Sequence, residues 1–333
     1  MKLVVTVDTE ADNQWSFGCP ISIRNTQWLP PFQVLCSRHG FRPTYLVSWE
    51  VANDEESTAL MRPWREQGEA GIGAHLHPWT TPPSLDEPDR RFNDSAHVFP
   101  SELEPSLLEA KLIRLTDEIT TAFGERPTSF RAGRFGIDSN CGGMLEALGY
   151  EVDSSVTPGI SWRRVVGEAS SCYGPSFVDA PLHPYHPSAE DISRLGAMTL
   201  LEVPLTILHS NLLSIRLEST AARVGKLAKV PLERLRRVIW PRMQPLWLRP
   251  FPWMTRDRML YVWEAAERLG LPLAVMMFHS SELMPGASPY RPTLQSVQEL
   301  LTVLDGFFAA LSDRGVEGLT LSEVALTRWP IGT

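Results

Sequence analysis

The fold is decided first by the stretch KLVVTVDTE at residues 2–10, where a short apolar run is followed at once by two carboxylates. The run is too short for a signal peptide and is typical of a buried β-strand. Side chains alternate along a strand, so Asp8 and Glu10 should point to the same side. We expect a strand over residues 3–7 that carries two acidic groups at its end.

Similar β-rich runs recur along the chain and are separated by stretches with helical periodicity. They cover residues 44–47, 71–74, 129–130, 152–154, 199–203, 273–278 and 316–319, with helices expected over 105–123 and 257–269. This alternation indicates parallel strands joined by crossover helices. We predict an α/β fold, a distorted (β/α) barrel of seven or eight mostly parallel strands, with a doubly wound open sheet as the alternative.

Length and charge pattern predict one elaborated domain over residues 1–333. Two segments interrupt the alternation: a proline-rich loop at 80–105 and a basic, tryptophan-bearing segment at about 210–258. The basic segment holds eleven Lys or Arg against three Asp or Glu, and we expect an amphipathic helix over 221–240 within it. We interpret it as a helical insertion, either a solvated lid or a surface that contacts anionic lipid.

Composition narrows the class of partner and the compartment. A net charge of −8 and a pI near 5.6 argue against nucleic-acid binding, which needs a basic face. No apolar stretch reaches the roughly 20 residues of a membrane-spanning helix, so we expect a cytoplasmic protein. Four scattered cysteines without a C-x-x-C pair suit reduced thiols rather than a disulfide framework.

Ionisable residues follow nearly every predicted strand, at the barrel end where catalytic groups gather. They are Asp8, Glu10, His75, His77, Arg131, Asp153, Glu202 and His279. Any one of them alone is compatible with ordinary loop polarity. Their number favours a site.

The stretch GIGAHLHPW at residues 71–79 is the strongest local signal for that site. Strand alternation places His75 and His77 on one face, as in a metal-ligand pair, although a hydrogen-bonded turn is the alternative. One carboxylate after the first strand would complete the site, and the other would be free to act as general base. Arg131 could hold a carboxylate, and His279 suits proton donation to a departing amine or a structural role.

The ordered set of motifs resembles the polysaccharide deacetylase family, also called NodB-homology or family-four carbohydrate esterases, across nearly the whole chain. The matching stretches are VTVDTE (5–10), RPTYLV (42–47), IGAHLH (72–77), FRAGRFG (130–136), GYEVDSS (149–155) and MFH (277–279). The resemblance implies a distorted barrel and a metal-dependent deacetylase. Its divergent branch, linked to exopolysaccharide gene clusters and including WalW-like proteins, is the most similar.

The resemblance also implies catalytic roles. Asp8 would be the general base, His279 the general acid, and Arg131 would orient Asp8. Asp153 would position His279 or Arg131.

Metal ligation follows from the same resemblance, with departures from the family pattern. Thr9 stands where the family's metal carboxylate is usual, so that role passes to Glu10, with Asp12 in reserve. Trp79 stands where the second histidine is usual, so His77 must serve beside His75. The donor set suggests a divalent metal, zinc in the first place.

We therefore predict a carbohydrate N-deacetylase acting on a cytosolic or lipid-linked saccharide. Trp79, Arg134, Phe135 and Tyr185 are the predicted substrate-binding residues, with backbone N–H groups at Arg134 and Phe135 assisting the oxyanion. Contact with membrane lipid through 210–258 is a further expectation. The alternatives are a formamide or other non-sugar C–N hydrolase and a catalytically silent glycan-binding barrel.

Overall fold

The chain is described here by a computed structural model that covers residues 1–12, 14, 21–83, 99–163, 174–209, 245–327 and 329. The strands of these residues are β1 (Lys2–Thr9), β2 (Thr44–Val47), β3 (Gly71–Leu76), β4 (Ser129–Ala132), β5 (Val152–Asp153), β6 (Leu201–Glu202), β7 (Ile207–Leu208), β8 (Leu246–Trp247), β9 (Leu273–His279) and β10 (Gly318–Leu319). All eight predicted strands are present, with ends shifted by a few residues. The antiparallel pair β7–β8 was not predicted.

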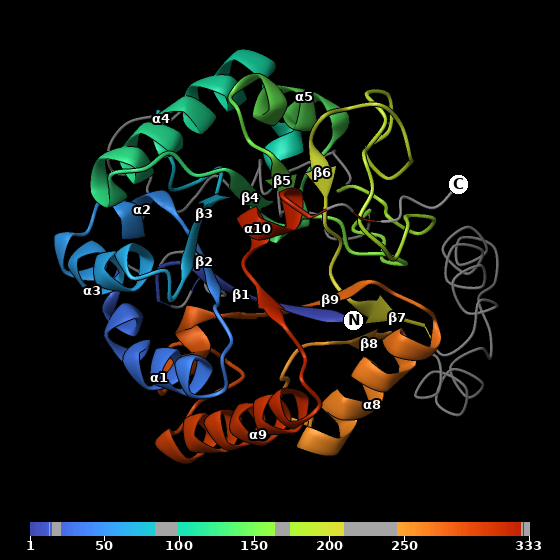
Figure 1. The fold of residues 1–333 in the computed structure, drawn as a ribbon. Helices are drawn as coiled ribbons and strands as arrows, with labels where there is room; N and C mark the ends of the chain where they lie inside the picture. The colour runs from blue at the N-terminus through green and yellow to red at the C-terminus, as the bar shows by residue number, and fades with distance from the viewer. Residues whose placement is uncertain are drawn as a thin grey trace, which may run out of the picture.

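Seven strands form one continuous parallel array in the order β9-β1-β2-β3-β4-β5-β6. The strand β1 pairs with three strands. On one edge β9 pairs with it from Lys2 to Asp8, and on the other edge β10 pairs with its first half and β2 with its second half. The sheet curves round on itself (Figure 1). The segment after β6 is hydrogen-bonded to β9, because the N–H of Thr206 donates to Val275 O at 3.2 Å. The predicted distorted barrel is confirmed.

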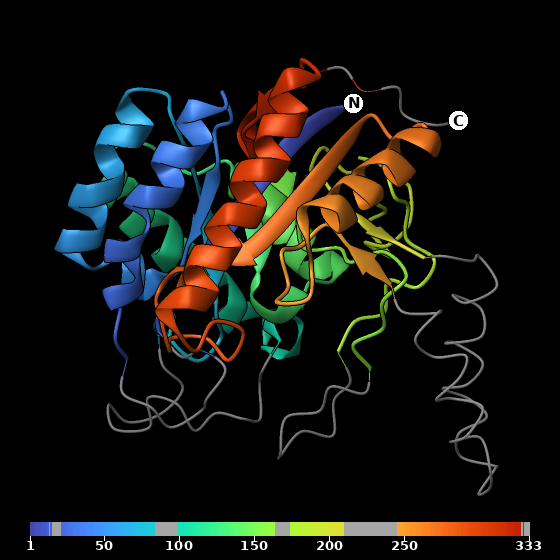
Figure 2. The ribbon, with the colours of Figure 1, turned by 90° about the horizontal axis from the view of Figure 1, so that it is seen from below.

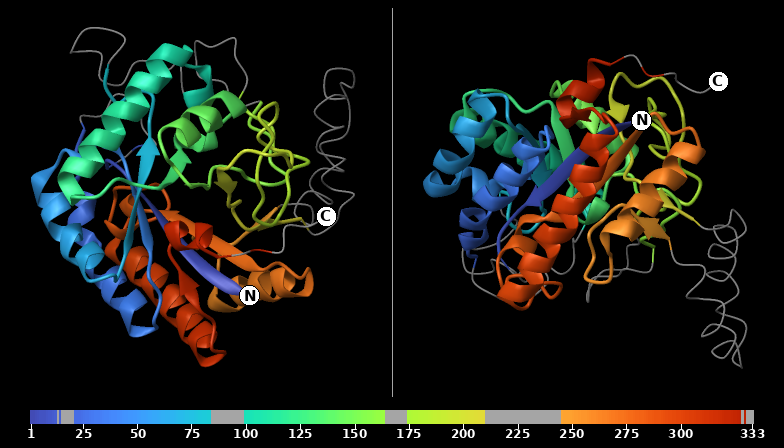
Figure 3. Two further views of the ribbon diagram at one scale, coloured as in Figure 1. Left: turned by 45° about the horizontal axis from the view of Figure 1, so that its top comes forward. Right: turned by 60° about the horizontal axis from the view of Figure 1, so that its bottom comes forward.

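Helices lie on the outside of the curved sheet, as Figures 1 and 3 show from different directions. They are α1 (Pro30–Arg38), α2 (Trp49–Ala52), α3 (Glu55–Glu66), α4 (Pro105–Phe123), α5 (Ser139–Ala147), α8 (Arg256–Arg268), α9 (Leu294–Asp313) and α10 (Leu321–Ala325), with short 3-10 turns η1 (Arg24–Trp28), η2 (Pro100–Glu102), η3 (Gly133–Phe135) and η5 (Ser280–Leu283). The predicted helix at 105–123 is confirmed to the residue. It begins with Pro105 in its first turn and ends at Gly124, whose φ of 74° suits a glycine cap.

The two ends of the barrel differ. The helix α10 covers the end where the strands begin, since the N–H of Leu321 donates to the hydroxyl of Thr44, the first residue of β2. In Figure 2 the dark-blue β1 begins near the N label, beside the short red helix α10. The opposite end, where the strands finish, carries the predicted site residues.

The two predicted insertions are described only in part. Residues 84–98 of the proline-rich range and 210–244 of the basic range lie outside the described residues, and with them the helix expected over 221–240. Residues 245–258 belong to the barrel, because they form β8 and the start of α8. Among the described residues, no helix is long and apolar enough to cross a membrane.

Candidate active site

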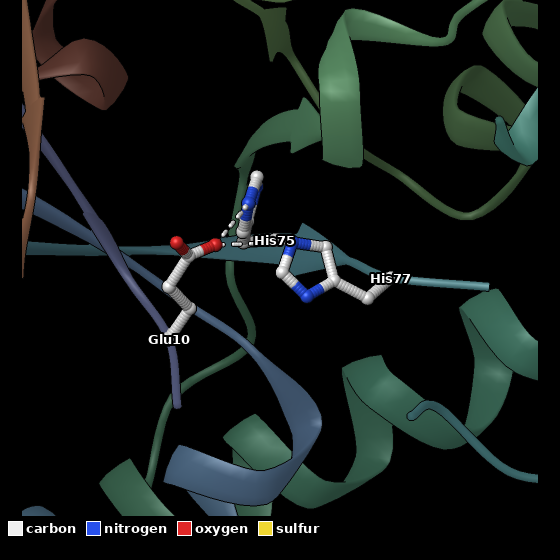
Figure 4. A group of neighbouring side chains, drawn as sticks. All are labelled: Glu10, His75 and His77. Carbon is white, nitrogen blue, oxygen red and sulfur yellow. Dashed lines mark ion pairs between the residues drawn. The ribbon is translucent and has the colours of Figure 1, made fainter. Parts of the chain in front are cut away.

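Three buried side chains meet at the carboxyl ends of β1 and β3 (Figure 4). A carboxylate oxygen of Glu10, Oε2, lies 3.1 Å from Nε2 of His77 and 3.5 Å from Nε2 of His75. Their possible ligand atoms all lie within 4.8 Å of one another, and each residue is at most 3% exposed. Two imidazoles and one carboxylate are a donor set that zinc and similar ions take in three-ligand catalytic sites. The predicted ligand residues are thus brought together.

His75 is prepared as a ligand by its second nitrogen. Its Nδ1 lies 2.9 Å from the carbonyl oxygen of Arg131 on β4. A carbonyl only accepts, so Nδ1 carries a hydrogen, and Nε2, on the side of Glu10, is the nitrogen that would bind an ion in place of its own hydrogen. This is how metal-binding histidines are commonly oriented.

His77 is held mainly by packing. Its ring stacks on Trp79, with centroids 4.5 Å apart and planes at 18°. Gly133 lies against the other part of the ring, since a Cβ at that position would press on His77 and would lie 2.7 Å from Leu76 O. Within the described residues Nδ1 of His77 has no hydrogen-bond partner. Trp79, predicted to bind substrate, therefore supports a ligand ring.

Asp8 forms the second part of the site, beside the three ligands. Its Oδ1 accepts a 2.6 Å hydrogen bond from Arg131 Nη1, and Arg131 is fully buried. Burial alone would raise the pKa of Asp8, but Arg131, with His75 and His279, outweighs it and holds the pKa below its usual value. Asp8 is therefore an ionised carboxylate, with Oδ2 not used by Arg131.

The pKa values of Glu10 and His75 also depend on the charges of their neighbours. Burial opposes the charged form of Glu10, yet the imidazoles of His279, His75 and His77 lower its pKa well below the usual range. Burial would lower the pKa of His75, but Asp8 and Glu10 raise it. The carboxylates and the imidazoles of the cluster thus stabilise one another's charged forms.

His279 stands at the end of β9, where it is the register neighbour of Asp8 on β1. Its Nε2 is 3.9 Å from Asp8 Oδ2 and 3.9 Å from Glu10 Oε1. Its Nδ1 side is occupied by Arg249 and Glu282, which sequence reasoning missed. The spacing of Glu282, three residues after His279 in η5, was the available signal.

The turn after β4 has an unusual backbone. Arg134 and Phe135 have φ values of 51° and 61°, the left-handed region that residues with a Cβ seldom adopt. Such conformations are kept where the surroundings enforce them, often at functional sites. Phe135 is stacked on Trp162 and Arg134 lies over Trp79, with 5.5 Å between ring centroids and 5.7 Å from guanidinium to ring.

Asp153 lies deeper than predicted. Its carboxylate accepts from the hydroxyl and N–H of Ser155 and pairs with Glu202, its register neighbour on β6. Burial raises the pKa of both carboxyls, so the pair retains a proton. Asp153 influences Arg131 electrostatically, but its carboxylate accepts hydrogen bonds from Ser155 rather than from Arg131 or His279.

Two further expectations are corrected. Tyr185 is fully buried and its hydroxyl donates to Ile192 O at 2.7 Å, so it is not available to a substrate. Asp12 accepts from the N–H and the side-chain amide of Asn25 and from Ser22, which commits it to a turn rather than to the cluster. Glu10 is the acidic member of the cluster.

Comparison with known proteins bears on the fold. No protein-family model matches the chain, and no curated protein sequence matches it. Among solved structures, a Mycobacterium smegmatis protein assigned as a polysaccharide deacetylase is similar, with a TM-score of 0.54, 15% identity and coverage of 97% of this chain and 88% of that one. The predicted resemblance is confirmed at the level of fold.

Two glycoside-acting enzymes share this fold to a similar degree. An alpha-amylase from Thermotoga maritima has a TM-score of 0.52, 10% identity and coverage of 99% of this chain and 75% of that one. A GH57 branching enzyme from Thermococcus kodakaraensis has a TM-score of 0.50, 11% identity and coverage of 98% and 71%. Because one fold hosts different reactions, the site has to carry the functional argument.

Proposed function

We propose that this chain is a metal-dependent hydrolase that removes an N-acyl group, acetyl in the first place, from an amino sugar. One observation carries the proposal: the Glu10, His75 and His77 donors converge beside an ionised carboxylate, Asp8, that a buried arginine holds in place. Glycoside cleavage by the usual route needs a pair of carboxyl groups flanking the bond. Here one of the two acids of the site, Glu10, is engaged by imidazoles, which favours acyl transfer over glycoside cleavage.

The residues present fit a divalent ion, zinc above all. Glu10, His75 and His77 would hold it, since their donors face one another and the hydrogen of His75 is kept on the far nitrogen. When bound, the ion would polarise the acyl carbonyl and lower the pKa of a coordinated water.

Asp8 is the proposed general base. Arg131 occupies Oδ1 and leaves Oδ2 toward His279, so that one oxygen is fixed and the other is directed into the site. A depressed pKa keeps the carboxylate ionised and able to take a proton from water as it attacks the carbonyl carbon.

His279 is the proposed proton donor to the departing amine. Its Nε2 lies 3.9 Å from a carboxylate oxygen of Asp8 and 3.9 Å from one of Glu10, beside Asp8 on the neighbouring strand. Backbone N–H groups of the left-handed turn at Arg134 and Phe135 would stabilise the oxyanion. The stacked rings of Phe135 and Trp162 would offer an apolar face to a sugar ring.

The finer parts of the substrate stay predictions. One such prediction is that the saccharide is cytosolic or lipid-linked. Another is that the basic range contacts membrane lipid, and its residues 210–244 lie outside the described structure. They would follow from substrate screening rather than from the site geometry.

The test is product release from zinc-loaded protein. We expect acetate from N-acetylated amino-sugar oligomers and little formate from N-formyl analogues, and Asp8→Asn should lower kcat by about 10²- to 10⁴-fold. Asp305→Asn, at a carboxylate on α9 that is 45% exposed, is the control and should have no effect. Formate as the main product would indicate a formamide hydrolase. Protein that cannot be loaded with metal, or Asp8→Asn with full activity, would refute the proposal.

A further inference from the structure

We infer that Arg249 sets which nitrogen of His279 carries the hydrogen, keeping it on Nε2, the atom that faces Asp8 and Glu10. Arg249 would therefore be a positioning residue for neutral His279, whose Nε2–H is a hydrogen-bond donor; the proton that reaches the departing amine comes from the imidazolium form, in which Nδ1–H has Glu282 as its acceptor. The inference rests on the proposed function for its chemical meaning, although its geometry is independent of it.

Three groups meet at the outer side of the His279 ring. Arg249 Nη2 lies 3.0 Å from Nδ1 of His279 and 2.8 Å from Glu282 Oε1. The same Glu282 oxygen accepts from the backbone N–H of His279 at 3.3 Å and lies 3.4 Å from Nδ1. Nδ1 thus has one close donor and one more distant acceptor.

The closer contact decides the tautomer. A guanidinium has only hydrogens to offer, so Nδ1 must present its lone pair to Arg249. A hydrogen on Nδ1 would face a second N–H at 3.0 Å, while its bond to Glu282 would be at the long limit for a hydrogen bond. Glu282 Oε1 is already the acceptor of Arg249. Nδ1 is therefore the acceptor and Nε2 the donor.

The inner side of the ring favours the same arrangement. Nε2 has two carboxylate oxygens, from Asp8 and Glu10, at 3.9 Å. A lone pair on Nε2 would point toward this negative charge, whereas an N–H is attracted by it. Both sides of the ring thus select the same tautomer.

Arg249 is itself held rigidly. Its guanidinium lies over the rings of Phe251 and Tyr290, at 4.7 and 5.2 Å from their centroids, and its side chain is 7% exposed. Cation–π contacts of a desolvated arginine are among the stronger ones. Arg249 lowers the pKa of the neighbouring Glu282 against the effect of burial, so this pair stays charged. The ring of His279 is consequently held against a fixed donor.

The consequence is a hydrogen-bond donor aimed at the reacting atoms. With Nε2–H facing the cavity, His279 can hydrogen-bond to the leaving nitrogen without first rotating or exchanging its hydrogen. Loss of Arg249 would remove the donor that lies 3.0 Å from Nδ1 and leave the Glu282 acceptor beside it, which would draw the hydrogen to Nδ1.

The test is the tautomer itself, read by NMR on metal-free protein labelled with ¹⁵N-histidine at about pH 8, above the usual pKa of histidine. The chain has eight histidines, and His279→Gln identifies the signal that is lost. We expect wild-type His279 to show Nε2–H. Arg249→Met should move the population mainly to Nδ1–H, and Arg249→Lys should retain at least part of the Nε2–H form.

Arg291→Met is the matched control. Arg291 is also buried and near Glu282, but its side chain donates to Pro250 O. It should leave the tautomer unchanged. In the same variants kcat should fall for Arg249→Met with KM retained, and both should stay near wild type for Arg291→Met.

Two outcomes would overturn the inference: Nδ1–H in the wild-type protein, which needs no variant to observe, or an unaltered tautomer in folded Arg249→Met. The NMR reading requires neither substrate nor turnover. A tautomer shift in a protein without deacylase activity would therefore refute the proposed function while supporting the role of Arg249.

Discussion

Replacing Arg131 by methionine should destabilise the protein more than almost any other single change. The guanidinium is fully buried and donates four hydrogen bonds: to Asp8 at 2.6 Å, to Thr6 at 2.9 Å, and to the carbonyl and hydroxyl of Ser154 at 2.8 and 3.0 Å. Breaking a buried ion pair from one side costs about 3–5 kcal/mol, because the other charge is left without a partner. We expect a loss of that size in the free energy of unfolding at neutral pH.

The loss should depend on pH in a defined direction. In the wild type the pKa of Asp8 is lowered, so its stabilisation is present above the unfolded pKa of about 3.9 and disappears as pH falls through the folded value. In the variant, burial without Arg131 should raise that pKa, so stability is lost as pH rises above about 4. The difference between the two proteins should therefore be smallest near about pH 3–4 and grow toward neutrality.

Urea unfolding of both proteins with chelator, at steps between about pH 4 and 8, measures this difference. Arg42→Met is the matched control, because Arg42 pairs with Glu323 at the same 2.6 Å but with side chains 37% and 31% exposed. Its cost should stay below about 1 kcal/mol. A pH-independent cost for Arg131→Met, or one no larger than the control, would show that Asp8 does not depend on Arg131 for its charge.

Three other changes test neighbouring parts of the site. Glu10→Gln should weaken zinc binding in calorimetric titration by more than about 100-fold, the upper range for changes outside the ligand shell, and an unchanged Kd would remove Glu10 from the ligand set. Gly133→Ala should displace the His77 ring and weaken zinc binding, whereas Gly143→Ala, where a Cβ meets nothing within 4 Å, should not; equal affinities would contradict the packing argument. Glu202 has a raised pKa through burial, so wild-type stability falls as pH rises above about 4.3 toward the folded value. Glu202→Gln should flatten that decline in urea unfolding between about pH 5 and 7, and an unaltered slope would place the proton elsewhere.

Most of the barrel was predictable because each of its longer strands is a short continuous run of apolar residues. Apolar runs such as residues 3–7 and 273–278 are buried on both faces in a parallel sheet, which gives an unbroken signal in the sequence. The pair β7–β8 gave no such signal. Two-residue strands at Ile207–Leu208 and Leu246–Trp247 are joined only by tertiary pairing across a long intervening segment.

The meeting of the site residues was also predictable, for a geometric reason. Parallel strands end on one side of the barrel, and period-two alternation carries Asp8 with Glu10 and His75 with His77 to the same cavity. The structure brings these four residues together with His279, while their catalytic and ligand roles stay proposals.

Other contacts are made by irregular segments, whose course through the structure is not predicted by sequence periodicity. Arg249 was counted only as one charge of a basic segment, yet it is buried against His279. Tyr185 lies in the irregular stretch between β5 and β6, where no repeat indicates which side chains turn inward. Glu282 was overlooked because it lies three residues after His279 in a 3-10 turn, and the strand pattern did not predict that turn.

Arg131 serves the two halves of the site through different parts of one residue. Its guanidinium binds Asp8, and its carbonyl oxygen fixes the hydrogen of His75. A one-residue slip of β4 against β3 would disturb the carboxylate and the imidazole together. We therefore expect that related chains either keep both components or lose both, with few intermediates that retain a well-ordered cation site but a misplaced carboxylate.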